Sequence, residues 1–413
     1  MNDGVALEIS NVKQIRWRYL LVGSVVLLFA GIIHAWSILK APFAAEFKWD
    51  AAQLALNYTL TLSFFCIGGF VAGLLSKKIG TRMLLVISAA LLFVGFFITS
   101  RLSGDNVSLL YLAYGALAGS GIGIVYITII GVVNAWFPDK KGLCSGTLMM
   151  SFGFSALIIG RTAATVMSMP SVGWRSTFLI LAFVTGGVIL LAAFVIKKPP
   201  QDASFPTAKT KAKAVQGDAV INDYTALEMI SRVSFWLIFI FFMLLCSVGI
   251  VAIAFAKDLF VVVGSSPEFA ATMVGILAIF NGLGRIISGA IFDRYGVRTT
   301  QFAASATAIV SPALVLLAIT SGSLVIGIIG LCLCGVTYGF CPTLSASFTS
   351  AFYGTKNFSL NFSIMNLVLI PASFAATIAG SLLKSTGSFT VVFIILISCS
   401  VLGLLINIFI KRP

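Results

Sequence analysis

The residues best suited to bind an anion are an arginine and an asparagine inside one apolar stretch. Arg285 and Asn281 are four residues apart, so they share a face if the stretch is helical. An arginine in a lipid-facing helix costs about 2.5–3.5 kcal/mol on insertion scales, so it should face a polar cavity. There its planar fork matches a carboxylate, and the asparagine can donate a further hydrogen bond. We predict that Arg285 anchors an anion; the alternative is a structural arginine satisfied by backbone carbonyls or by an aspartate.

Two further side chains in apolar stretches could carry a proton. His34 is the only histidine, and it can titrate near neutral pH, hydrogen-bond a ligand or serve as a satisfied core residue. Asp258 is placed inside a helix end, where apolar surroundings favour the protonated carboxyl. Its neighbour Lys257 points about 100° away on a helix, so the two are not each other's best partners. We assign Asp258 and Lys257 to proton coupling or to an ion-pair gate. Lys40, at the end of its span, is expected at the membrane interface.

The composition shows that lipid surrounds the elements that position these residues. Hydrophobic residues make up 59% of the chain, charged residues only 10%, and the mean hydropathy is +1.07. Lipid admits only helices or closed barrels, and long uninterrupted apolar runs are helices. We predict an all-α integral membrane protein with 12 transmembrane helices, near residues 19–40, 51–76, 82–101, 107–135, 142–168, 174–197, 235–262, 267–292, 299–320, 323–349, 358–383 and 389–411.

The chain is duplicated. The decapeptide GLLSKKIGTR begins at Gly73, and GAIFDRYGVR begins at Gly289 in the corresponding place of the second half. Tyr126 and Tyr338 end a second repeated pair, GIVY and GVTY, at nearly the same separation. A period this long indicates two fused copies of a multi-helix unit. We predict two six-helix pseudo-repeats, at 1–197 and 231–413, joined by a polar cytoplasmic linker at 198–230.

The net charge of +14 reflects membrane topology rather than nucleic-acid binding. Most of the 27 lysines and arginines fall in alternate loops, on the side that also holds both termini. The positive-inside rule therefore predicts cytoplasmic termini. The first 18 residues lack an apolar core with a cleavage site, so the first span is expected to be retained, and the brief termini favour a prokaryotic inner membrane.

No metal site, cofactor or enzymatic activity is predicted. The seven cysteines lie in or beside apolar spans, where free thiols act as small hydrophobic side chains. An enzyme would need a nucleophile with a base, or a metal cluster. The sequence offers one histidine, no HExxH motif and no paired carboxylates inside spans. The glycines of the fourth span, at GxxxG spacing, indicate close helix packing instead of a phosphate loop: Gly115, Gly119 and Gly123.

Twelve helices in two related halves, with a loop of the GxxxDRxGxR type after spans two and eight, resemble the major facilitator superfamily. The second copy matches the pattern in full, and the first copy has Lys77 at the aspartate position. The residues themselves predict a tight turn at Gly80 or Gly296 with basic residues beside helix C-termini. The motif bears on gating, and its residues are Gly73, Gly80, Arg82, Gly289, Asp293, Arg294, Gly296 and Arg298.

Further stretches give a finer resemblance, to the oxalate/formate antiporter family and the related monocarboxylate porters. They are Asn134 to Gly142 with Ser145-Gly146, Ala256-Lys-Asp258, Asn281-Gly-Leu-Gly-Arg285 and Tyr353 to Phe358. This resemblance implies small carboxylate substrates such as lactate, pyruvate, formate and oxalate. It also implies that spans 1, 4, 7 and 10 line a central cavity. Tyr126 and Tyr338 could then reach a bound carboxylate, unless they serve packing alone.

The same resemblance implies that dicarboxylate exchange needs a second cation on the eleventh span, at a position that falls on Met365. Because that residue is apolar, we predict a monocarboxylate. An anion entering alone would oppose the membrane potential by about 2.3 kcal/mol per 100 mV, so we predict proton symport of a lactate- or pyruvate-like acid by alternating access. The alternatives are an obligatory anion exchanger of oxalate/formate type and a non-transporting membrane sensor. The expected partners are the substrate, the proton and the bilayer, with a monomeric carrier.

Overall fold

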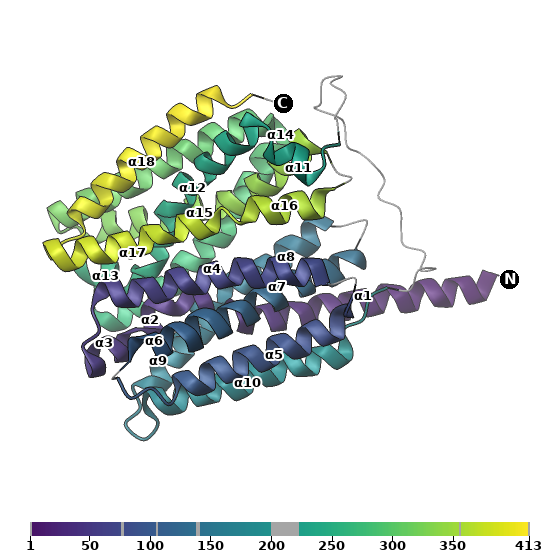
Figure 1. Ribbon diagram of the computed structural model, residues 1–413, viewed down its shortest axis with the longest axis horizontal. Coiled ribbons are helices and arrows are strands. Elements are labelled where there is room, and N and C mark those ends of the chain that lie inside the picture. Colours follow the sequence, from purple (N-terminus) through teal and green to yellow (C-terminus); the bar gives the residue numbers. More distant parts are fainter. Residues whose placement is uncertain are drawn as a thin grey trace.

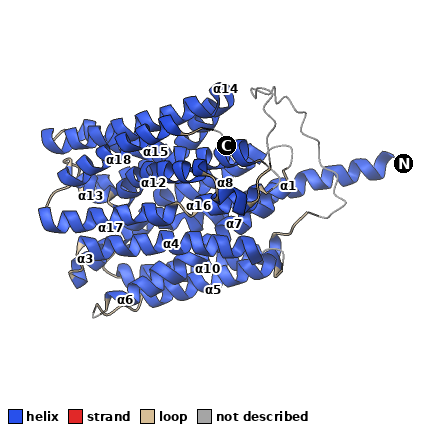
Figure 2. Ribbon diagram, turned by 45° about the horizontal axis from the view of Figure 1, so that its top comes forward, coloured by secondary structure: helices blue, strands red, loops and turns tan. Residues whose placement is uncertain are grey.

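The chain folds into a bundle of long helices. The computed structural model describes residues 2–75, 78–104, 106–137, 141–199, 223–354 and 357–411, and these ranges form helices and short connections without a strand (Figure 2). Within these ranges, 12 helices are long and apolar enough to cross a membrane. The predicted all-α membrane fold is confirmed, and the predicted span ends differ from the observed ones by only a few residues, except in spans 1, 7 and 9.

The first half contributes six spans. Their elements are α1 (Asn2–Ala30), η1 (Gly31–Ala35), α2 (Trp36–Leu39), α3 (Ala41–Phe47), α4 (Ala51–Leu75), α5 (Gly80–Thr99), α6 (Val107–Leu110), η2 (Tyr111–Ala118), α7 (Gly119–Ala135), α8 (Lys141–Ser155), η3 (Ala156–Gly160), α9 (Arg161–Met167) and α10 (Gly173–Val195). The first span is therefore interrupted, because η1 is a 3-10 turn between α1 and α2.

The second half contributes the other six spans. Its elements are α11 (Ala226–Ile230), α12 (Val233–Ala254), α13 (Ala256–Val262), α14 (Pro267–Ser321), α15 (Leu324–Tyr353), α16 (Phe358–Asn366), α17 (Leu369–Thr386) and α18 (Thr390–Phe409). Of the predicted linker 198–230, residues 200–222 lie outside the described part of the chain. Its end forms α11, which a Thr225–Glu228 capping box starts.

Both termini lie at the same end of the bundle (Figure 1). We call this end the terminal end and the opposite end the distal end. The outer surface between them carries large exposed apolar side chains, such as Leu191 and Phe409, which are each 68% exposed. Apolar exposure of this extent marks a surface that faces lipid. The chain is a multi-pass membrane protein.

Within each half, glycines bring an equivalent pair of helices into backbone contact. A Cβ added at Gly68 of α4 would lie 2.4 Å from the Ser120 carbonyl oxygen of α7, and one at Gly284 of α14 would lie 2.3 Å from that of Val336 in α15. Residues 68 and 120 recur as 284 and 336, at the spacing of the repeated decapeptides. The close packing predicted from the GxxxG pattern is confirmed, since Gly123 also meets the α4 backbone.

The two copies of the repeated loop share a backbone turn. Gly80 has φ +75° and Gly296 has φ +78°, a region that favours glycine, and Gly296 separates the eighth span from the ninth within α14. The predicted tight turns are therefore present. Arg82 lies over the Phe194 ring at 4.4 Å, and Arg294 over the Tyr295 ring at 5.3 Å. Lys77 lies outside the described residues, and a gating role for the motif stays a prediction.

We expect Gly284→Val to destabilise the protein, because the new side chain would meet the Val336 carbonyl. Overpacking of this kind costs about 1–3 kcal/mol. The apparent melting temperature in detergent should fall by roughly several degrees. Gly131→Val is the matched control, since Gly131 is exposed on α7 and a Cβ there meets nothing within 4 Å. Equal melting temperatures for the two variants would contradict the proposed close contact.

Candidate functional site

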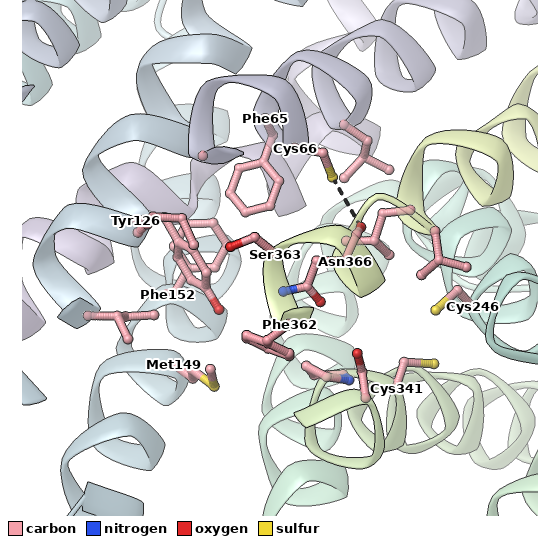
Figure 3. A pocket seen from close by; sticks show the side chains of 18 of the residues that line it. Phe65, Cys66, Tyr126, Met149, Phe152, Cys246, Cys341, Phe362, Ser363 and Asn366 are labelled. Carbon is pink, nitrogen blue, oxygen red and sulfur yellow. Dashed lines mark hydrogen bonds between the residues drawn. The ribbon is translucent and has the colours of Figure 1, made fainter. Parts of the chain in front are cut away.

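A cavity of about 130 Å³ lies between the two halves (Figure 3). Its wall combines η1, α4, α7 and α8 of the first half with α12, α14, α15, α16 and α17 of the second. Four of the predicted binding residues line it together: His34, Tyr126, Arg285 and Tyr338. They come from spans 1, 4, 8 and 10, so the structure unites residues that the sequence separates by up to 304 positions.

Arg285 reaches from α14 across the cavity to the other half. Its Nη1 donates a hydrogen bond to the Met149 carbonyl oxygen of α8 at 3.2 Å. Its Nε is buried and has no hydrogen-bond partner. The α14 backbone here is fixed by α15, since Thr343 Oγ1 donates to the Arg285 carbonyl oxygen and Gly339 lies against the same turn. Nε thus lacks an acceptor, which one oxygen of a bidentate carboxylate would supply.

The cavity wall carries one permanent charge. Among the described residues that line it, Arg285 is the only lysine or arginine, and none is an aspartate or glutamate. Charges in a low-dielectric interior interact more strongly than in water, so an uncompensated cation favours entry of an anion. The electrostatics of the wall therefore agree with the predicted anion site.

His34 faces the cavity from the 3-10 turn η1. Gly31 allows this approach, because a Cβ there would collide with the Phe152 carbonyl oxygen of α8. The imidazole lies edge-on to the Phe152 ring at 5.2 Å and to the Tyr338 ring at 6.4 Å. Its Nδ1 is buried without a hydrogen-bond partner. His34 is thus held by ring contacts and keeps one nitrogen for a ligand or a proton.

The duplicated tyrosines line the cavity from opposite halves. Tyr126 packs against the rings of Phe65 at 5.3 Å and Phe152 at 4.9 Å. Tyr338 is almost fully buried, and its Cβ lies where a side chain on Gly249 of α12 would be. Both hydroxyls belong to residues of the wall, so the structure is compatible with the predicted contact to a carboxylate from two sides.

Two predicted positions do not reach the cavity. Asn281 is 1% exposed, lies against Gly335 and Gly339 of α15, and is not part of the wall. Its Oδ1 has no hydrogen-bond partner. Met365 is fully buried and also lies outside the wall. The eleventh span instead presents uncharged neighbours of this residue: Phe362, Ser363 and Asn366.

Asp258 lies at the distal end, away from the cavity wall, and is paired across the two halves. Lys40 Nζ of the first half donates to Asp258 Oδ2 at 2.6 Å. The ammonium also lies 4.3 Å from the centre of the Phe255 ring. The lysine side chain is 8% exposed and the aspartate 43%. Lys257 is half-buried beside this pair and also lies outside the wall. Lys40 is therefore an ion-pair partner, where the sequence indicated a residue at the membrane interface.

A second ion pair closes the distal end beside the first. Lys384 Nζ donates to Asp50 Oδ2 at 2.7 Å, joining α17 to the start of α4. Thr59 Oγ1 continues this seam, donating to the Ser373 carbonyl oxygen at 2.7 Å. Nearer the cavity, Cys66 Sγ donates weakly to the Asn366 carbonyl oxygen, as Figure 3 shows. The two halves thus meet along α4 and α17 from the distal end to the cavity.

Asp50 is not suited to carry protons. Partial burial raises the pKa of Asp50, but hydrogen bonds from Lys384 and from backbone N–H groups outweigh this and hold its pKa below the ordinary 3.8. A carboxylate with a lowered pKa contributes stability that is present above its ordinary pKa and is lost as pH falls through the lowered one. Between about pH 5 and 8 the Asp50 carboxylate therefore stays ionised.

Sequence reasoning missed the aromatic part of the wall. Phe65, Phe152 and Phe362 line the cavity, yet nothing in their spacing separates them from the other phenylalanines, of which the chain has 35. Three of the seven cysteines also line it: Cys66, Cys246 and Cys341. The burial predicted for them is confirmed.

Two six-helix halves with a cavity between them form an architecture that many membrane transporters share. Residues 20–377 match the Major Facilitator Superfamily, and the chain belongs to this family. The solved structure of a D-xylose-proton symporter superposes on 95% of this chain and 98% of its own with a TM-score of 0.70, at 14% identity. The resemblance predicted from the sequence is confirmed.

Three relatives refine this placement. The MFS-type transporter YhjX of Escherichia coli (strain K12) is 27% identical over 87% of this chain and 86% of its own. An oxalate:formate antiporter of Oxalobacter formigenes is 27% identical over 68% of this chain and 64% of its own. Monocarboxylate transporter 12 of Homo sapiens is 25% identical over 92% of this chain and 77% of its own. The chain is similar to all three along most of its length.

We expect Asp258→Asn to open the distal end, because it leaves Lys40 without its ionic partner. Pulsed EPR should detect this between spin labels at Arg101→Cys and Ser321→Cys, which are exposed at distal ends of the two halves. If the variant loses about 1–3 kcal/mol of the free energy that favours the closed distal end, the population with long label distances should rise relative to the population with short ones roughly 5- to 150-fold.

The control for this experiment is Glu46→Gln, which removes the Glu46–Arg175 ion pair within the first half and should leave the distances unchanged. The exchanged pair, Lys40→Asp with Asp258→Lys, should restore the short distance. Unchanged distances in Asp258→Asn would show that the pair does not hold the halves together.

Proposed function

We propose that the protein is a secondary active transporter of small monocarboxylates of the lactate and pyruvate kind, working by alternating access. The observation that supports this is the single guanidinium of Arg285 in a cavity wall whose described residues include no acid. Its Nε lacks an acceptor, which one oxygen of a carboxylate would supply. The similarity to an oxalate:formate antiporter and to a monocarboxylate transporter points to the same substrate class.

One charged group favours one carboxylate. The eleventh span contributes only uncharged side chains to the wall, so a dicarboxylate would leave its second anionic group without a cation. An unpaired charge inside a membrane protein is strongly disfavoured. The cavity therefore suits a monocarboxylate better than oxalate.

Proton symport is the coupling that we propose. A proton that enters with the anion removes the opposition of the membrane potential, about 2.3 kcal/mol per charge per 100 mV. His34 lies in the cavity wall with a free nitrogen, whereas Asp258 is held by Lys40 outside it. We therefore assign proton binding to His34 and gating to Asp258. In this proposal the carrier works as a monomer in the inner membrane, with both termini cytoplasmic and the repeated loop gating that side.

A second candidate, obligatory anion exchange, follows from a specific observation. Arg285 has no carboxylate partner among the described wall residues, so closing the empty cavity around it would bury an uncompensated charge. Such a charge opposes occlusion by several kcal/mol. If His34 does not supply a compensating change in protonation, only the loaded carrier would reorient readily, and each anion would leave in exchange for another.

We expect Arg285→Lys to weaken uptake of labelled L-lactate into proteoliposomes, because an ammonium lacks the bidentate fork. A charged hydrogen bond contributes about 1.5–3 kcal/mol, so the apparent affinity should fall roughly 10- to 150-fold. Arg285→Ala should abolish uptake. Arg161→Lys is the control, since Arg161 lies outside the cavity wall and is exposed. Normal affinity in Arg285→Ala would refute its role as anchor.

We expect His34→Gln to remove the stimulation of uptake by an inward proton gradient, because glutamine keeps hydrogen-bonding atoms but does not titrate. Asp258→Asn should keep that stimulation while changing the maximal rate. Uptake that requires internal anion and ignores the gradient in the parent protein would establish exchange in place of symport.

A further inference from the structure

We infer that the acid carried at this site is an aryl monocarboxylate, with its carboxylate on Arg285 and its ring among Phe65, Tyr126 and Phe152. This rests on the proposed function and names the substrate more narrowly than lactate or pyruvate. The inference depends on three properties of the cavity: the rings in its wall, its volume, and the position of those rings relative to the guanidinium.

The first property is a continuous aromatic wall on one side. The rings of Phe65, Tyr126 and Phe152 contact one another in all three pairs, at centroid distances of 4.9–6.2 Å. Figure 3 shows these three side chains grouped, with Phe362 of the other half across the cavity from them. Aromatic pairs at such distances prefer edge-to-face or offset contact, so these faces and edges suit a further ring.

The second property is the size of the cavity. Its volume of about 130 Å³ is close to that of an engineered apolar cavity of about 150 Å³ that holds benzene. A three-carbon acid would leave much of this apolar wall uncovered. Filling it with a ring gains both apolar burial and ring contacts, each pair of rings being equivalent to about a two- to twelvefold change in affinity.

The third property is the position of Arg285 relative to the aromatic wall. Arg285 Nη1 is held by the Met149 carbonyl, and Phe152 follows one helical turn later on the same face of α8. Three residues advance an α-helix by about 4.5 Å. Arg285 and Phe152 both line the cavity, so an aryl acid with its carboxylate on the guanidinium would extend its ring within the space that the Phe152 ring bounds.

The test is competition binding on the purified full chain, with tritiated benzoate as the probe in a scintillation proximity assay. We expect benzoate to bind at least tenfold more tightly than L-lactate or acetate. Benzamide has the same ring and no charge, so it should not compete. Phthalate adds a second carboxylate and should compete at least tenfold less well than benzoate.

Variants of the wall test the position of the ring. Phe152→Leu and Phe65→Leu should each weaken benzoate at least fivefold, and should weaken benzoate more than L-lactate. Phe183→Leu is the matched control, because Phe183 is 60% exposed on α10 and lies outside the cavity wall, so both affinities should stay at the parent value. Two variants are used so that poor folding of one, visible in gel filtration, leaves the other as the measurement.

The outcomes separate the inference from the proposed function. Arg285-dependent L-lactate binding as tight as that of benzoate would overturn the aryl assignment and leave monocarboxylate transport standing. Benzoate that binds but gives no counterflow in proteoliposomes at pH 8 would also overturn it, since the ring acid would then be an inhibitor. Absence of binding and counterflow for every acid would overturn both.

Discussion

The arrangement of the whole protein depends on keeping one guanidinium out of lipid. Arg285 sits in a helix that must otherwise be apolar, and its charge is tolerated only because the two halves enclose a cavity beside it. The α14–α15 glycine contact fixes its backbone, and the Met149 carbonyl of the other half holds one of its nitrogens. The binding group is therefore also a contact between the halves. Any rocking of one half on the other must break or replace this bond, which links occupancy of the site to conformation.

Closure at the distal end depends on ion pairs and hydrogen bonds between the two halves. Two ion pairs, Lys40–Asp258 and Asp50–Lys384, join the halves. Lys384 is exposed, so its pair contributes little, whereas Lys40 is buried and depends on Asp258 for its partner. Hydroxyl contacts at Thr59 and Ser373 extend the same seam inward. A seam of polar contacts between the halves is suited to opening and closing, because these contacts can be exchanged for water at the distal end.

The sequence predicted the spans and the duplication, and it indicated Arg285 as the candidate anchor, because hydropathy, repeats and an intramembrane arginine are local signals. It did not predict which faces meet. Asn281 shares a helical face with Arg285, yet only the arginine lines the cavity, and Asn281 lies where the α14 backbone meets Gly335 and Gly339 of α15. Likewise, the Lys40–Asp258 pair and the aromatic wall join residues of different helices. Such contacts are set by how helices pack, which no single stretch of sequence records.

The cavity wall carries its charge on one side only, and this asymmetry follows from one position of the repeat. Gly68 and Gly284 are equivalent glycines, and the residues that follow them are Gly69 and Arg285, both in the cavity wall. An arginine at residue 69 would place a second cation on the opposite side and suit a molecule with two carboxylates. Glycine there instead lets the Ile127 side chain approach, since a Cβ at residue 69 would lie 2.9 Å from its Cγ1. The duplicated fold thus supplies a symmetric frame, while a single unequal position makes the cavity charged on one side, which is the basis of the proposed preference for an acid with one carboxylate and an apolar body.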